Sequence, residues 1–269
     1  LLEAVAGWDE MDSTSISGPV PNFAGSLDVG VEGLRIGLVT ELMGEGIDPQ
    51  VREAVTAMAD RLGSAGAEIV EVALPAAAYA LSAYYLIAPA EASANLARFD
   101  GVRYGHRTDD LDGTTEDMMA RSRAEGFGPE VVRRILLGTY ALSAGYYDAF
   151  YGQAQRVRTL MRDDFTAAYD QVDVLISPTS PTTAFEVGER AADPIAMYYS
   201  DVCTIPSNLS GDPAISVPVG LDDAGLPIGF HVMAPALGEE MLFRVAAEVE
   251  RLAAFTDRAV LATSEEVKP

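Results

Sequence analysis

The sequence predicts an α/β fold: a mixed, largely parallel β-sheet covered by helices. Three observations predict it. Strand and helix patterns alternate over residues 34–74, a further strand pattern follows a long helical stretch at 172–177, and a hairpin pattern closes the series at 214–233. Alternating strands and helices are typical of parallel sheets, and the hairpin adds an antiparallel pair. With no internal repeat and no evident linker, we expect a single domain over residues 1–269.

The first elements predict a β-α-β unit. Residues 34–39 read as a short buried strand, and Asp48-Pro49 is an N-cap followed by proline at the first helical position. Apolar residues then recur at helical spacing until glycines end the helix at residues 63–66: Val51, Val55, Met58, Ala59 and Leu62. Residues 67–74 form the next strand. A parallel pair with a right-handed crossover is therefore expected. We also expect an amphipathic helix at the start of the chain, from Leu1 to Trp8.

The middle of the chain is predicted to be helical. Residues 73–90 are nearly all apolar, but Pro75 and Pro89 bracket them and tyrosines interrupt them, so we expect a buried helix over 76–98 and no membrane span. The glycine- and aspartate-rich residues 99–113 read as a loop.

Two more helical segments follow that loop. Thr114 or Thr115 is expected to cap a short helix that runs towards Arg123. Gly128-Pro129 opens another, and helical structure is expected to continue with breaks to Tyr169. Gly138 and Gly145 are the expected weak points.

The C-terminal part predicts the rest of the sheet. Residues 172–177 form a strand that Pro178 ends, and a rigid, hydroxyl-rich loop follows over 178–184. Residues 197–209 are expected to be partly helical. The strands 214–219 and 227–233 flank a turn at residues 222–225, which indicates a hairpin. A final amphipathic helix carries Met241, Leu242, Val245, Val249 and Leu252.

The charge balance argues against direct nucleic-acid binding. The chain has 41 acidic and 18 basic residues, a formal charge of −23, and a single lysine, Lys268. Because nucleic-acid binding depends on Lys and Arg neutralising phosphates, any nucleic-acid substrate should be carried by a partner.

Cysteine and histidine usage excludes two further kinds of site. Cys203 is the only cysteine, so an intrachain disulfide and a cysteine-based zinc site are impossible. We interpret Cys203 as a small buried residue in a reducing, cytoplasmic protein. The two histidines, His106 in a loop and His231 in a strand, lack metal-ligand spacing, so no metal site is expected. No charged segment followed by an apolar stretch opens the sequence, and no secretory signal is expected.

Several long strings resemble the amidase-signature family. They are residues 94–105, 128–140 (GPEVVRRILLGTY), 145–151 (GYYDAFY) and 197–220, and the resemblance runs from about Asp12 to Arg251. Within the family they are similar to the A subunits of tRNA-dependent amidotransferases. The resemblance implies an amidase-signature fold, incomplete on its N-terminal side.

The resemblance also implies an activity. A serine nucleophile, activated through a second serine and a lysine, attacks the side-chain amide of glutamine. Ammonia then passes to a partner B subunit, which uses ATP and Mg²⁺ to convert Glu-tRNA(Gln) to Gln-tRNA(Gln). The implied partners are the B and C subunits, with tRNA contacted only through them, and no cofactor is expected in this chain.

The sequence departs from the family at the catalytic segment. The resemblance places the Ser-Ser-Lys residues upstream of the residues present here, and Lys268 lies in a polar tail. No catalytic residue is therefore assigned, and the isolated chain is expected to lack amidase activity.

Three substrate-binding positions are carried over from the resemblance. Arg134 would pair with the α-carboxylate of glutamine, Asp201 would hold its α-ammonium group, and Tyr85 would line the pocket and donate a hydrogen bond. Arg133 is adjacent to Arg134, but helical rotation separates the two side chains by about 100°. Without the resemblance these residues would be read as a solvated helix face, a helix cap and a core tyrosine.

Two other functions remain open. The chain could belong to another amidase-signature hydrolase that acts on small amides. Alternatively, it could be a non-catalytic binding module that kept the fold and lost the triad.

Overall fold

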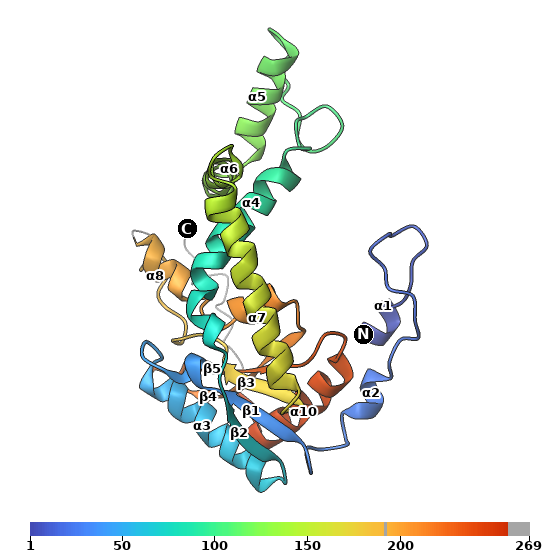
Figure 1. Cartoon of the computed structure of the whole chain (residues 1–269), viewed down its shortest axis with the longest axis vertical. Coiled ribbons are helices and arrows are strands. Elements are labelled where there is room, and N and C mark those ends of the chain that lie inside the picture. The colour runs from blue at the N-terminus through green and yellow to red at the C-terminus, as the bar shows by residue number, and fades with distance from the viewer. Residues whose placement is uncertain (191–192, 258–269) are drawn as a thin grey trace, which may run out of the picture. The chain divides into compact units, whose positions relative to one another are not determined.

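The computed structural model describes residues 1–190 and 193–257 (Figure 1). Its internal contacts divide the chain into two compact units. The first unit comprises residues 1–73, 168–203 and 212–269 and contains the sheet. The second comprises residues 74–167 and 204–211 and is helical.

The first unit is built on a five-stranded sheet of order β2-β1-β3-β5-β4. Its strands are β1 (Arg35–Val39), β2 (Glu68–Val72), β3 (Val174–Pro178), β4 (Ala214–Leu221) and β5 (Pro227–Met233). β1 pairs in parallel with β2 and β3, whereas β5 is antiparallel to β3 and β4. Within this sheet, β5 alone therefore runs against the others. The predicted mixed, largely parallel sheet is confirmed.

One face of the sheet carries the core of the first unit. Alternate residues of each strand point to the same face, and this face is buried under α3 (Pro49–Ser64) and α10 (Glu239–Ala253), which lie along the sheet in Figure 1. The strands contribute Ile36, Val174, Ile176, Phe230 and Val232, and the helices Val55, Met58, Leu62, Leu242, Val245 and Val249. The short α2 (Phe23–Ser26) packs on α10, with the Phe23 and Phe243 rings edge to face at 5.6 Å.

The predicted β-α-β unit is confirmed. The Asp48 side chain accepts a hydrogen bond from the Gln50 N–H at 2.8 Å, and Pro49 is the first residue of α3. After the helix, Gly66 adopts a φ of +99°, which favours glycine. The strand that follows pairs with β1 in register, with Ile36 opposite Ile69.

The N-terminal helix is shorter than expected. α1 covers only Leu2–Val5 and buries none of its residues. Ala6 is already extended, and Gly7 has a φ of +145°, so the chain leaves the helix before Trp8. The predicted extension to Trp8 is wrong because the backbone at Ala6 and Gly7 is not helical.

The second unit is a set of helices in which α4 and α6 lie side by side (Figure 1). Its elements are a 3₁₀ turn (Pro75–Tyr79), α4 (Ala80–Leu96), α5 (Thr115–Gly126), α6 (Pro129–Leu142), a π-helical turn (Asp148–Gly152), α7 (Gln153–Tyr169) and α9 (Ile205–Ser210). The last two residues of α7 are counted with the first unit. The predicted succession of helices with breaks up to Tyr169 is confirmed.

The start of the helix in the apolar segment differs from expectation. Residues 75–79 form a 3₁₀ turn, whose Ala76 N–H donates to the Asp164 carboxylate at 2.7 Å, so α4 begins only at Ala80. Pro89 lies inside α4, as the expected helix over 76–98 implies. Across the described residues, each helix falls short of the length or apolar content that a membrane span requires.

Gly138 is not a weak point of α6. The helix runs through it without a break from Pro129 to Leu142. A β-carbon at this position would lie 1.9 Å from the Pro89 carbonyl oxygen of α4, so the absence of a side chain allows the two helices to approach each other. The prediction for Gly145 is confirmed: it has a φ of +90° and lies in the turn after α6.

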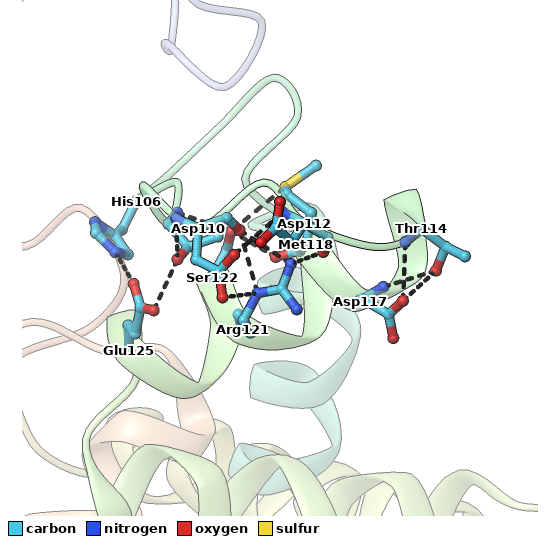
Figure 2. Close-up of polar contacts among 10 residues, drawn as sticks. His106, Asp110, Asp112, Thr114, Asp117, Met118, Arg121, Ser122 and Glu125 are labelled. Carbon is cyan, nitrogen blue, oxygen red and sulfur yellow. Dashed lines mark hydrogen bonds and ion pairs between the residues drawn. The ribbon is translucent and has the colours of Figure 1, made fainter.

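The loop over residues 99–113 is held by polar contacts to α5 (Figure 2). Thr114 and Asp117 form a capping box, and α5 continues three residues past Arg123 to Gly126. Glu125 of α5 accepts hydrogen bonds from Thr108 and contacts His106 Nε2, both at 2.8 Å, while Arg121 donates to the Asp110 and Asp112 carbonyls. His106 is thus a loop residue, as its sequence context predicted, and it contacts a carboxylate of α5.

The last predicted elements are also found. Residues 197–209 are helical in part, in α8 (Pro194–Tyr199) and α9, with a turn between them. β4 and β5 form the predicted hairpin, in which the Asp222 carboxylate accepts from the Ala224 and Leu226 N–H groups. Lys268 lies outside the described residues.

Candidate functional site

Arg134 projects from α6, one turn beyond the helix start. Gly128 is the N-cap and Pro129 the first helical residue, which places Glu130 four positions before Arg134 on the same face. The Arg134 Nε donates to Glu130 Oε1 at 2.8 Å, and its Nη1 lies 3.5 Å from the Tyr84 hydroxyl of α4. The side chain is one-third exposed, so the guanidinium group is anchored but reachable by a ligand.

Arg133 shares the same carboxylate. Its Nε donates to Glu130 Oε2 at 2.9 Å, so the two oxygens of Glu130 serve two arginines. Taken together, the Glu130, Arg133 and Arg134 side chains have a formal charge of +1, an excess of positive charge in a chain of −23. Such an excess favours an anionic ligand.

The protonation equilibria follow from these contacts. The hydrogen bond from Arg134, together with the weaker influence of Arg133, holds the pKa of Glu130 below its ordinary value. The same hydrogen bond to Glu130, followed by the contact with Tyr84, raises the pKa of Arg134. Both groups are therefore charged near neutral pH.

Tyr85 lies beside this arrangement, next to the tyrosine that approaches Arg134. Tyr84 and Tyr85 are both half-buried on α4, and their rings pack edge to face with centroids 5.0 Å apart. It is the Tyr84 hydroxyl that approaches Arg134. The structure thus brings Tyr85 and Arg134 into the same unit, linked through Tyr84.

Asp201 belongs to the other unit. It is exposed and lies in the turn between α8 and α9, where its N–H donates to the Tyr198 carbonyl at 3.2 Å. The N-cap of α9 is Thr204, so Asp201 is not the cap of that helix.

Sequence reasoning missed Tyr84 and Glu130. The i to i+4 spacing of Glu130 and Arg134 is a signal that could have identified Glu130, because oppositely charged side chains at this spacing meet on a helix. Tyr84 had no such signal, since its contact with Arg134 depends on how α4 packs on α6.

The remaining nucleophilic and titratable candidates are structural. Cys203 is fully buried against Ile47, Val51 and Ile228, and burial raises its pKa to about 12. His231 is buried in β5 with Nδ1 3.4 Å from the Ser177 hydroxyl, and burial lowers its pKa to about 4. Within the described ranges, no group of three His, Cys, Asp or Glu side chains could hold a metal ion.

A concave region lies in the first unit, at the carboxyl end of β3. A cavity of about 400 Å³ is lined by hydroxyls and apolar groups: Thr179, Ser180, Thr182, Thr183, Ala184, Phe185, Ser216, Pro218, Pro227, Ile228 and Gly229. Several hydroxyls already have partners: Thr179 with Ser216 at 2.7 Å, and Thr183 with Asp222 at 2.7 Å. None of the predicted site residues lines this cavity.

A mixed sheet covered by helices places the chain in the α/β class. The model of the Amidase family matches residues 1–243, and the chain belongs to this family. It is 54% identical over 253 residues to the A subunit of glutamyl-tRNA(Gln) amidotransferase from Synechococcus sp. (strain RCC307), covering 94% of this chain and 52% of the relative. The corresponding protein of Salinispora arenicola is 56% identical over 255 residues, covering 93% of this chain and 52% of the relative.

Solved structures show the same fold. The A subunit of glutamyl-tRNA(Gln) amidotransferase from Thermotoga maritima is similar with a TM-score of 0.70 and 35% identity, over 91% of this chain and 48% of that one. The peptide amidase of Stenotrophomonas maltophilia has a TM-score of 0.64 and 27% identity, over 94% and 50%. The chain spans about half the length of the relatives it matches.

Proposed function

We propose that this chain provides the glutamine-binding part of the A subunit of a glutamyl-tRNA(Gln) amidotransferase. That subunit hydrolyses glutamine to supply the ammonia that converts Glu-tRNA(Gln) to Gln-tRNA(Gln). The observation that carries the proposal is identity above one half, along nearly the whole chain, to curated relatives of that name. The anchored, partly exposed guanidinium group of Arg134 supports it independently, because glutamine carries an α-carboxylate.

Two of the three proposed binding residues match the charged ends of the amino acid. Arg134 pairs with the α-carboxylate, because a planar guanidinium group binds a carboxylate through two parallel hydrogen bonds. Asp201, exposed and acidic, holds the α-ammonium group. Tyr85 lines the pocket and donates a hydrogen bond. The isolated 269-residue chain is proposed to have no amidase activity of its own.

The rest of the reaction belongs to partners. In this proposal B and C subunits complete the complex in the cytoplasm, and the B subunit uses ATP and Mg²⁺ to activate Glu-tRNA(Gln). A formal charge of −23 favours leaving the tRNA to a partner, since a phosphate backbone is repelled by an acidic surface.

The test is a glutaminase assay on an amidase of the relatives' full length that carries this sequence, with and without B and C subunits. We expect ammonia release from glutamine and, with ATP, Mg²⁺ and Glu-tRNA(Gln), formation of Gln-tRNA(Gln). Preferential hydrolysis of unrelated small amides would instead support another amidase-signature hydrolase. Binding of B and C subunits without turnover of any amide would support a non-catalytic module.

A further inference from the structure

We propose that Glu130 and Tyr84 are positioning residues that fix the orientation of the Arg134 guanidinium group and so determine selectivity for amides that carry a carboxylate. The inference rests on the proposed function, in which Arg134 binds the α-carboxylate of glutamine. It adds two residues that act through Arg134 without contacting the substrate.

The hydrogen bonds of Arg134 leave one edge of the guanidinium group for a ligand. An arginine side chain has five N–H donors. In the described structure the Nε–H of Arg134 donates to Glu130 at 2.8 Å, and one Nη1–H points to the Tyr84 hydroxyl at 3.5 Å. The second Nη1–H and the two Nη2–H groups remain for a carboxylate, which can bind in a bidentate manner across Nη1 and Nη2.

The anchors come from two different helices. Glu130 lies on α6 itself and fixes the Nε side of the group, whereas Tyr84 lies on α4 and fixes Nη1. The Tyr84 ring is in turn packed edge to face on Tyr85 at 5.0 Å. A long, flexible side chain loses conformational freedom when it binds a ligand, and two anchors reduce that loss by restricting the side chain beforehand.

A neutralising role and an orienting role of Glu130 predict opposite effects on substrate binding when the Glu130 carboxylate is replaced. Glu130 is shared by Arg133 and Arg134, and a Glu130→Gln substitution changes the formal charge of the three groups from +1 to +2. If Glu130 only neutralised the arginines, that change would tighten the binding of a carboxylate. If Glu130 orients Arg134, the same change weakens binding despite the added positive charge.

The experiment measures KM and kcat of an amidase of the relatives' full length that carries this sequence. The substrates are glutamine and 4-aminobutyramide, which keeps the amide and the ammonium group but lacks the carboxylate. For Glu130→Gln we expect a roughly 5- to 10-fold higher KM for glutamine, the effect of losing one charge-assisted hydrogen bond, with kcat little changed. Tyr84→Phe should raise KM by roughly two- to threefold, because its contact is long. Neither should alter kinetics with 4-aminobutyramide.

A matched control is Glu116→Gln. It removes the same charge from the first turn of α5 in the same unit, and no change in KM is expected. Because Glu130 is half exposed, its substitution should not unfold the protein, which thermal melting checks. Glu130→Asp keeps the charge on a shorter side chain. Its KM for glutamine should lie between that of the original protein and that of Glu130→Gln.

The outcomes separate this inference from the proposed function. If Arg134→Gln raises the KM for glutamine and Glu130→Gln leaves it unchanged or lowers it, the positioning role is refuted while the binding role of Arg134 stands. If Arg134→Gln itself leaves the KM for glutamine unchanged, Arg134 is not the carboxylate ligand and the positioning role is refuted with it, while ammonia release from glutamine still tests the proposed function separately. If Glu130→Gln raises the KM for 4-aminobutyramide as much as that for glutamine, the substitution acts on the structure in general, which would also refute the positioning role.

Discussion

Gly138 of α6 lies against Pro89 of α4 so closely that a β-carbon at position 138 would come within 1.9 Å of the Pro89 carbonyl oxygen. The Ser93 β-carbon would lie 2.8 Å away. Both contacts are between the two helices that carry Tyr84 and Arg134. The distance between these helices, and with it the contact of Tyr84 with Arg134, therefore depends on the missing side chain at position 138.

Gly138→Ala should destabilise the second unit. Alanine is the better helix former by about 1 kcal/mol, but overpacking typically costs about 1–3 kcal/mol, and backbone at 1.9 Å cannot move aside as a flexible side chain could. We expect a net loss in the free energy of unfolding, measured by urea denaturation. The control is Gly63→Ala in α3, where the nearest atom would be the Ile69 side chain at 3.6 Å and no loss is expected. Equal stability of the Gly138→Ala protein would contradict the close packing.

His231 should make the protein less stable in mild acid. Burial lowers its pKa from 6.5 to about 4, so between these values the unfolded chain binds a proton that the folded chain does not. The folded protein therefore carries no penalty from His231 above about pH 6.5, and its free energy of unfolding decreases as the pH falls towards 4. Between pH 7 and pH 5 the loss should be about 2 kcal/mol.

The measurement for His231 is the free energy of unfolding at pH 7 and pH 5 for the original protein and for His231→Gln. Glutamine preserves a polar partner for Ser177 and does not titrate. Carboxylates that titrate in this range contribute equally to both proteins, so the difference between them isolates His231. If both proteins lose the same amount of stability between the two pH values, the pKa of His231 is not lowered in the folded protein.

Local patterns in the sequence were sufficient to predict most helices, strands and turns, but not which of these elements lie next to each other. The cap at Asp48, the apolar spacing of α3 and the turn at residues 222–225 are each encoded within a few residues, and the structure confirms them. That β5 lies between β3 and β4 depends on strand pairing over long separations, which periodicity does not report.

The candidate site shows the same limit. Arg134 and Tyr85 were singled out by resemblance, yet the residue whose hydroxyl approaches Arg134 is Tyr84, one position earlier on α4. Adjacent residues on a helix point about 100° apart, so only the packing of α4 on α6 decides which tyrosine faces the arginine. Gly138 was misread for the same reason, because its role is a contact with another helix.

Cys203 should behave as a packing residue and not as a nucleophile. Its thiol is fully buried, and burial raises its pKa to about 12. A reagent therefore cannot reach the sulfur easily, and little of the thiol is in the reactive thiolate form. We expect native protein to react with a maleimide at about pH 8 far more slowly than urea-unfolded protein. Cys203→Ala should leave any amidase activity intact and cost about 1–2 kcal/mol of stability by leaving a small cavity. Rapid labelling of the native thiol would contradict its burial.

Substrate analogues that lack one charged end should separate the roles proposed for Arg134 and Asp201. Glutaramate keeps the carboxylate and the amide of glutamine but lacks the ammonium group, whereas 4-aminobutyramide keeps the ammonium group and lacks the carboxylate. In an amidase of the relatives' full length that carries this sequence, Arg134→Gln should raise the KM for glutamine and glutaramate by about tenfold or more, the effect of losing a charged partner, and leave 4-aminobutyramide unaffected. Asp201→Asn should raise the KM for glutamine and 4-aminobutyramide and leave glutaramate unaffected. Because the two patterns are opposite, a general loss of folding cannot produce both, and a variant that weakens all three substrates equally would remove that residue from the binding site.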